Sequence, residues 1–160
     1  MISILNKRRF MEIQNPKTIT KPWGNELWIA DGVRTPYALK RILFKEGFRS
    51  SLQVHMYKFE TNYVLSGKGI LQLRTEIFNC EEYLASLQKE SILTAALRTL
   101  KEIEISPGDV IDVKPGQIHR VVAVTDLVFI EASTKELDDV IRLADDASRG
   151  HGKIDSEHGN

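Results

Sequence analysis

Short segments of apolar or alternating apolar and polar residues, separated by turn residues, run through most of this chain. We expect strands at Ala38–Phe44, Ser51–Tyr57, Asn62–Leu65, Gly69–Leu73, Val110–Val113, Val121–Val124 and Leu127–Ile130. Turn-forming pairs follow several of them, namely Glu46-Gly47, Ser66-Gly67 and Pro115-Gly116. Many short strands punctuated by Gly and Pro predict an antiparallel all-β sandwich or barrel.

Two segments have a helical pattern instead. Residues 80–101 (CEEYLASLQKESILTAALRTLK) are rich in helix-forming residues and contain neither Gly nor Pro, which predicts a short helical insertion. Residues 133–147 begin with Ser133 or Thr134 as a candidate N-cap and place apolar residues at helical spacing. They predict a C-terminal helix that closes the domain.

The length of 160 residues suits one domain. We expect a lead-in at 1–20, a single domain at 21–149 with its helical insertion at about 80–101, and a flexible tail at 150–160. Hydrophobic residues make up 42% and charged residues 28%, which is typical of a globular protein.

Charge and composition exclude several function classes. The 22 Lys and Arg balance the 22 Asp and Glu, which argues against a dedicated binder of nucleic acid or of an anionic membrane. The longest apolar runs are far shorter than the roughly 20 residues of a spanning helix, and the first ten residues carry charges where a signal peptide would be apolar. The single cysteine excludes an intramolecular disulfide. We therefore expect a soluble cytoplasmic protein.

Two glycine-bounded stretches carry the candidate chemistry. In the first, Gln53 and His55 are two residues apart, so on a strand both side chains leave the same face. Glu60 follows five residues after His55, and a turn between them returns it to that face. The second stretch begins at Gly108 and ends with Gly116-Gln-Ile-His119.

These spacings resemble the two motifs of the cupins. Gln53 stands where the first motif usually has a His, and Lys114 stands at the usual Pro position of the second motif. The resemblance implies a double-stranded β-helix, also called a jelly-roll barrel.

Among cupins, this Gln-x-His-x₄-Glu form of the first motif resembles that of the type II mannose-6-phosphate isomerases. The cupin module of that family is often fused to a mannose-1-phosphate guanylyltransferase domain. The strings that carry the likeness are Lys21-Pro22-Trp23-Gly24, Lys40-Arg41-Ile42, Ser51-Leu52-Gln53, Ile118-His119-Arg120 and Asp138-Asp139-Val140-Ile141-Arg142. Asp145 and Arg149 continue the last of these strings, so the resemblance extends from Lys21 to Arg149. Only 20 residues precede Lys21, so we expect a stand-alone module.

The resemblance brings Gln53, His55, Glu60 and His119 together as ligands of one divalent metal ion. Two imidazoles, one carboxylate and one amide oxygen form a mixed nitrogen and oxygen set that suits zinc, with Mn, Fe, Co or Ni as alternatives. The alternative interpretation of each His alone is a core or turn residue. The neutral Gln ligand makes the ion more electrophilic towards a sugar oxygen and less suited to oxygen chemistry.

Three charged residues are candidates for catalysis. On a strand, Lys40 lies on the same face as the apolar Ala38 and Ile42. One interpretation is that it points into the barrel and acts as a proton shuttle; the other is that it lies at the rim in solvent. Glu131 interrupts an apolar run, a position that is costly for a carboxylate unless it has a partner or a function. Its two candidate roles are a catalytic base and the ion-pair partner of Lys40. The resemblance makes Arg120 a catalytic or phosphate-handling residue, although on a regular strand it points away from His119.

Two further residues are candidates for substrate binding. Asn62 shares the face of Glu60 and is placed to bind a sugar hydroxyl. Tyr57 shares the face of His55 and either packs there or binds substrate.

The resemblance implies a homodimeric isomerase that interconverts mannose 6-phosphate and fructose 6-phosphate for nucleotide-sugar and polysaccharide biosynthesis. Its partner is then a small sugar phosphate, with no nucleic acid and no membrane. The alternatives are a non-catalytic, metal-dependent sugar or nucleotide-sugar binding cupin, and another cupin enzyme. The latter is an epimerase or lyase on a related sugar, or an iron oxygenase, which the Gln disfavours.

Overall fold

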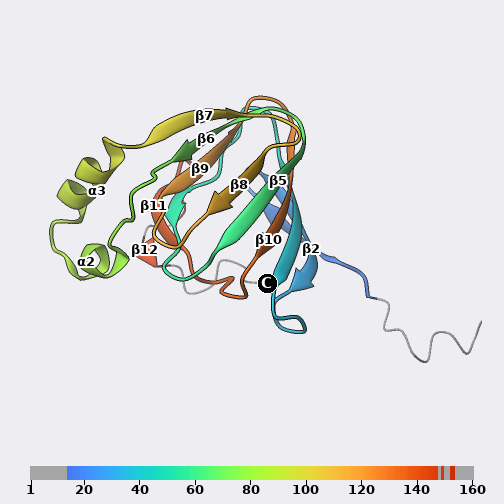
Figure 1. Ribbon diagram of the computed structural model, residues 1–160, viewed down its shortest axis with the longest axis horizontal. Helices are drawn as coiled ribbons and strands as arrows, with labels where there is room; N and C mark the ends of the chain where they lie inside the picture. Colours follow the sequence, from blue (N-terminus) through green and yellow to red (C-terminus); the bar gives the residue numbers. More distant parts are fainter. Residues whose placement is uncertain (1–13, 148, 150–151, 154–160) are drawn as a thin grey trace, which may run out of the picture.

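Two six-stranded antiparallel sheets face each other in the computed structural model, which describes residues 14–147, 149 and 152–153 (Figure 1). One sheet has the strand order β1-β2-β3-β10-β5-β8 and the other β12-β11-β4-β9-β6-β7. This arrangement confirms the predicted all-β barrel. The strands are β1 (Lys17–Lys21), β2 (Gly24–Asp31), β3 (Ala38–Phe44), β4 (Leu52–Val54), β5 (Glu60–Ser66), β6 (Gly69–Leu73), β7 (Lys101–Ile105), β8 (Val110–Val113), β9 (His119–Ala123), β10 (Leu127–Ser133), β11 (Ile141–Ala144) and β12 (Gly152–Lys153).

Strict alternation of burial along β3 shows how the sequence directs side chains into the barrel. Ala38, Lys40, Ile42 and Phe44 are buried, whereas the residues between them are half-buried. Apolar members of this face join a core between the sheets, in which Trp23 stacks on Phe44 with ring centroids 4.3 Å apart. Residues of this core, including Trp23, Ile42 and Phe44, line a cavity together with polar residues that also point inwards.

The turn before β9 brings the two glycine-bounded stretches together. Gly116 has a φ of +79°, and a Cβ there would lie 2.6 Å from Cγ2 of Ile77, so both the backbone conformation and the space favour glycine. Its backbone N–H donates to the carbonyl of His55 at 2.7 Å. In the adjoining pairing of β4 with β9, Gln53 lies opposite His119.

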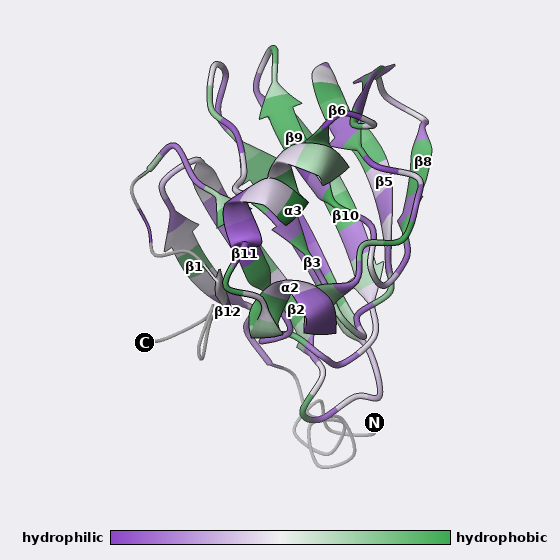
Figure 2. Cartoon of the chain, turned by 90° about the vertical axis from the view of Figure 1, so that its left-hand side faces the viewer, coloured by the Kyte–Doolittle hydropathy of each residue, from purple (hydrophilic) through white to green (hydrophobic). Residues whose placement is uncertain are grey.

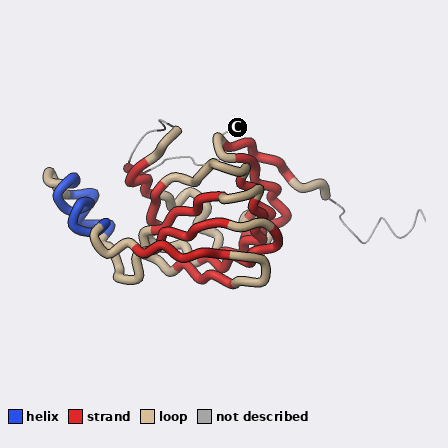
Figure 3. Tube along the Cα trace, turned by 90° about the horizontal axis from the view of Figure 1, so that it is seen from above, coloured by secondary structure: helices blue, strands red, loops and turns tan. Residues whose placement is uncertain are grey.

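The helical insertion predicted for about 80–101 is confirmed as two helices, α2 (Cys80–Ala85) and α3 (Lys89–Leu97). Asn79 caps α2 by accepting the backbone N–H of Glu82. A second apolar cluster joins the helices to strand residues that include Leu52 and Ile141. Figure 2 shows apolar residues on barrel strands such as β9, and Figure 3 shows that both helices project from the side opposite β1.

The predicted C-terminal helix over 133–147 is wrong. Ser133 ends β10, and Ile141–Ala144 forms β11, which pairs with β4. Of the apolar residues that suggested a helix, Ile141 and Ala144 lie on β11, where pairing with β4 lets Ile141 join the cluster beneath the helices, whereas Leu137 and Val140 precede the strand. Tertiary pairing therefore overrides a weak local pattern.

The chain ends also differ from the expectation. Strand β1 begins at Lys17, inside the predicted lead-in, and pairs along its length with β2. Of the predicted tail, the structure describes Gly152–Lys153, which form β12, and the remainder lies outside the described residues. None of the described helices is long and apolar enough to cross a membrane.

Candidate metal centre and its cavity

A cavity of about 70 Å³ lies between the two sheets. Its lining includes the following sequence-predicted site residues: Lys40, Gln53, His55, Glu60, Asn62, His119 and Glu131. Leu137 and Val140, from the segment between β10 and β11, also line it. Residues far apart in the sequence therefore converge because both sheets contribute to one space.

His55, Glu60 and His119 are all buried and each bring a ligand atom within 4.8 Å of the others. Nε2 of His55 lies 3.5 Å from Oε2 of Glu60, and Nε2 of His119 lies 3.6 Å from Oε1. A tetrahedral ion with bonds of about 2.1 Å separates its ligand atoms by about 3.4 Å. The buried Nε2 of His55 has no hydrogen-bond partner among the described residues, and a bound cation would satisfy this nitrogen. The residues present thus fit a divalent metal ion.

Both imidazoles are held with Nε2 turned towards the carboxylate. Nδ1 of His55 donates to the backbone carbonyl of Asp139, and Nδ1 of His119 donates to that of Gln117 at 3.0 Å. A carbonyl only accepts, so these bonds place the proton on Nδ1 and leave a lone pair on Nε2. Such outer contacts fix the orientation of metal-binding histidines.

Gln53 lies beside the three buried ligands and currently presents its amide nitrogen to them. Nε2 of Gln53 is 3.3 Å from Nε2 of His119, and Oε1 accepts a hydrogen bond from Ser51 at 2.9 Å. Rotation of the amide by half a turn exchanges the two atoms, and the Ser51 hydroxyl is able to accept from the nitrogen in that orientation. A ligand role for Gln53 therefore requires this rotation.

Buried charges of alternating sign extend from the candidate metal centre across the cavity. Nζ of Lys58 lies 2.6 Å from Glu60 and 3.0 Å from Glu131, and Nζ of Lys40 lies 3.8 Å from Glu131 and 3.4 Å from Glu26. Three carboxylates thus face two ammonium groups in the described lining, and the surplus negative charge favours a cation.

The pKa shifts follow from this arrangement. Burial alone would raise the pKa of Glu60, but Lys58 and the two histidines outweigh it and hold that pKa well below its ordinary value. Burial would lower the pKa of Lys58, yet Glu131 and Glu60 raise it above its usual range. Glu60 is therefore ionised and ready to bind a cation at neutral pH.

Tyr57 is not brought into the cavity, which corrects its predicted substrate-binding position. Strand β4 ends at Val54, and a turn replaces the expected strand before Tyr57. The Asp139 carboxylate holds this turn by accepting the backbone N–H groups of Met56, Tyr57 and Lys58 at 3.1, 2.5 and 2.8 Å. The tyrosine side chain consequently faces outwards and is 65% exposed.

Arg120 also lies away from the cavity, contrary to the catalytic position that the resemblance implied. His119 already belongs to strand β9, so alternation points the next residue to the opposite face. The Arg120 guanidinium donates to the carbonyl of Ala144 and to Asp146, both at 3.4 Å. Neither a bulge nor a turn reverses it.

Two charged residues of the cavity lining, Lys58 and Glu26, were missed by the sequence interpretation. Lys58 lies two residues before Glu60 and so had the same parity, but it was assigned to a connecting turn. Glu26 lies on β2, a strand that was not predicted, and it accepts a hydrogen bond from Trp28 at 2.8 Å. Lys58 stands between Tyr57 and Phe59, and Glu26 is followed by Leu27 and Trp28, so a charge beside bulky apolar residues was the available signal.

Asp139→Ala is expected to weaken metal binding by about 10- to 100-fold. The substitution removes the acceptor for the turn at 56–58 and loosens the backbone carbonyl that orients His55. Competition against a chromogenic zinc chelator measures the affinity. Asp138→Ala, at the neighbouring exposed carboxylate, is the matched control and is expected to keep it. Equal affinities of the two variants would contradict the positioning role.

Acid is expected to destabilise the metal-free protein through His119. Burial lowers the pKa of His119 to about 4, whereas the unperturbed value is 6.5. Between these values the unfolded chain binds a proton that the folded chain does not, so the free energy of unfolding falls as the pH drops. The expected loss from pH 7 to pH 4.5 is about 2–3 kcal/mol, measured by urea denaturation.

The matched variant for this measurement is His119→Gln, which is expected to lose less stability over the same pH interval. The lowered pKa of Glu60 acts in the same direction, but only below its ordinary value of 4.5. A wild-type curve that is flat between pH 6.5 and 4.5 would contradict burial of a neutral His119.

A double-stranded β-barrel with a buried His-Glu-His cluster defines the cupin class. Within it, the chain belongs to the mannose-6-phosphate isomerase C-terminal family, whose model matches residues 8–145. It is 29% identical over 116 residues to the alginate biosynthesis protein AlgA of Pseudomonas syringae pv. tomato, a match that covers 72% of this chain and 23% of AlgA. AlgA of Pseudomonas fluorescens gives the same identity and coverage. The chain thus spans about a quarter of the length of these curated relatives.

Solved structures support the fold. The capsular polysaccharide assembling protein CapF of Staphylococcus aureus aligns with a TM-score of 0.58 and 19% identity over 83% of this chain and 35% of CapF. Oxalate decarboxylase of Bacillus subtilis, a protein with Mn(II) centres, aligns with a TM-score of 0.56 and 20% identity over 81% of this chain and 30% of that one. At these identities the likeness shows the cupin architecture alone.

Proposed function

We propose that this protein is a metal-dependent sugar-phosphate isomerase that interconverts mannose 6-phosphate and fructose 6-phosphate in polysaccharide biosynthesis. The observation that carries the proposal is the buried cluster of His55, Glu60 and His119 in one cavity with Glu131. Membership of the mannose-6-phosphate isomerase C-terminal family supports this substrate, and similarity to AlgA supports this pathway.

His55, Glu60 and His119 would hold the ion, with Gln53 as a fourth ligand after its amide rotates. The bound ion supplies positive charge that stabilises developing negative charge on the substrate oxygens. Zinc is the ion we propose, because two neutral imidazoles and a carboxylate are ligands that it prefers.

Glu131 is the residue we assign to moving the proton between C1 and C2. Its carboxylate lines the cavity and accepts a hydrogen bond from Lys58, which also contacts Glu60, so it lies next to the candidate metal centre. Lys40 contacts the same carboxylate at 3.8 Å and orients it. Asn62 donates to Glu60 at 3.2 Å and offers its amide to a sugar hydroxyl.

The cavity must widen to admit a sugar. Its volume of about 70 Å³ is roughly half that of a cavity of about 150 Å³ that binds benzene, which is smaller than any hexose phosphate. Leu137 and Val140 lie on the segment between β10 and β11 rather than on a strand of the barrel. An outward shift of this segment is the change that substrate binding requires.

NMR of mannose 6-phosphate in D₂O with the zinc-loaded protein tests the proposal. We expect deuterium to enter C2 or C1 and fructose 6-phosphate to form. Glu131→Gln is expected to remove both signals while the protein keeps its zinc. Sugar binding without exchange would favour the non-catalytic binding cupin, and turnover only with iron and O₂ would contradict the isomerase.

The homodimer and the cytoplasmic location expected from sequence remain predictions. Size-exclusion chromatography with light scattering tests the homodimer, and a monomer at micromolar concentration would contradict it.

A further inference from the structure

The lysines in the cavity are already paired, which raises the question of where a substrate phosphate is bound. Lys40 contacts Glu26 and Glu131, and Lys58 contacts Glu60 and Glu131. No arginine of the described chain lines this cavity. A phosphate placed there would face three carboxylates in a space of about 70 Å³, at a high cost in desolvation and repulsion.

A larger groove of about 380 Å³ adjoins the cavity. Leu137 lines both spaces. Trp28 lines the groove, and its ring also lies over Nζ of Lys40, 4.6 Å from the ring centroid, at the cavity wall. One leucine and one indole ring therefore separate the groove from the candidate active site.

Three cationic side chains line the groove: Lys17, Arg34 and Lys135. They differ from the cavity lysines in how little they are paired with carboxylates. In the part of the chain that the structure describes, Lys17 and Lys135 have no carboxylate within ion-pair distance, and Arg34 pairs only through Nε, with Asp31 at 3.2 Å. Asp31 and Asp138 also line the groove, so the cations exceed the carboxylates by one. The terminal nitrogens of Arg34 are the group best shaped for a phosphate.

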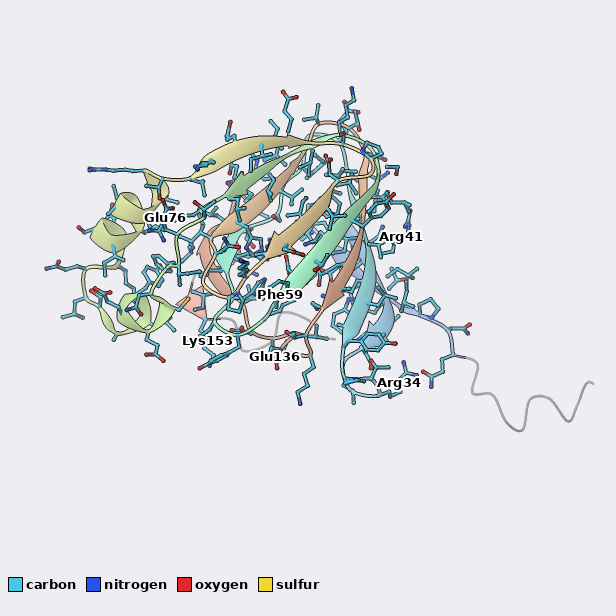
Figure 4. All side chains as sticks on the ribbon, in the orientation of Figure 1. Arg34, Arg41, Phe59, Glu76, Glu136 and Lys153 are labelled. Atoms are coloured by element: carbon cyan, nitrogen blue, oxygen red, sulfur yellow. The ribbon has the colours of Figure 1, made fainter. Side chains whose placement is uncertain are left out.

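Contacts of the turn at 31–34 position Arg34 and bring this turn close to the backbone at Lys135. The Asp31 carboxylate accepts the backbone N–H groups of Val33 and Arg34 at 3.1 and 3.2 Å, which fixes the turn that carries Arg34. Gly32, with a φ of +73°, packs so closely that a Cβ would lie 3.3 Å from Cα of Lys135. Figure 4 shows Arg34 at the end of the barrel near the β2–β3 turn, far from Glu76 beside the helices.

We propose that this groove binds the phosphate of a phosphorylated sugar whose carbonyl end enters the adjoining cavity. The inference rests on the proposed isomerase function for its substrate. It assigns to Arg34, Lys135 and Lys17 the phosphate contact that Arg120, on the outer face, does not make. The cavity then receives only the reacting part of the sugar, and the segment carrying Leu137 moves to connect the two spaces.

Titration of the zinc-loaded protein with sorbitol 6-phosphate, which has no carbonyl and cannot isomerise, tests this site directly. The double variant Arg34→Gln/Lys135→Gln is expected to raise the dissociation constant at least about tenfold, since hydrogen bonds to charged groups are the strong ones. Binding of unphosphorylated sorbitol and the zinc content are expected to stay unchanged. Arg98→Gln/Lys101→Gln removes the same charge near α3 and β7 and is the matched control.

The outcomes separate this site from the proposed reaction. A selective loss of sorbitol 6-phosphate binding in the groove variant supports the site, even if the wild-type protein fails to isomerise mannose 6-phosphate. Isomerisation with an unchanged KM in the groove variant would overturn the site and leave the isomerase standing. Equal weakening in both double variants would also overturn it, because only overall charge would then matter.

Discussion

His119→Ala is expected to abolish metal binding and, with it, isomerisation. The protein should contain close to one zinc per chain before the substitution and close to none afterwards, as measured by metal analysis after dialysis. The imidazole supplies one of three buried ligands, and its Nε2 lies 3.6 Å from the Glu60 carboxylate. Loss of the ion removes several kcal/mol of charge stabilisation in the transition state, which corresponds to a fall in kcat of about 10³-fold or more.

The control for this substitution is Gln72→Ala on the neighbouring strand. Gln72 lies opposite Arg120 in the pairing of β6 with β9, and its amide contacts Glu102 at the surface. It is expected to leave both zinc content and turnover unchanged. Full activity of His119→Ala without zinc would contradict the metal-dependent mechanism, whereas full zinc content would contradict the ligand assignment.

The strands were largely predictable because their alternation is strong. The segments Ala38–Phe44, Gly69–Leu73 and Val110–Val113 match β3, β6 and β8. The failure at 133–147 has a physical cause, since helical spacing of a few apolar residues carries less free energy than burial of Ile141 against β4. A local sequence pattern cannot predict the pairing of β11 with β4, because the two strands are more than 80 residues apart.

At the candidate metal centre, spacing and strand parity indicated which side chains meet, and the structure brings His55, Glu60 and His119 together. Parity failed at Tyr57, because the strand stops early at a turn that Asp139 holds. That contact joins residues 82 positions apart, so the pattern of neighbouring residues in the sequence cannot predict it. Strand parity correctly predicted that Arg120 points away from His119, although the family resemblance favoured a catalytic role for it.

Lys58→Met is expected to destabilise the metal-free protein by about 3–5 kcal/mol, because it leaves two buried carboxylates without their shared cation. Glu60 and Glu131 both accept hydrogen bonds from this ammonium group, at 2.6 and 3.0 Å. Urea denaturation at neutral pH measures the loss. Added zinc should restore part of it, since a cation bound at Glu60 replaces half of the missing contact.

Lys45→Met is the matched control for this buried lysine. Its ammonium group lies 2.8 Å from Asp126, but the two side chains are 55% and 52% exposed, so the expected loss of stability is much smaller than for Lys58→Met. Adding Glu131→Gln to Lys58→Met should recover stability, because one of the two facing charges is then removed. Equal losses in the two lysine variants would show that the buried network contributes no more than a surface pair.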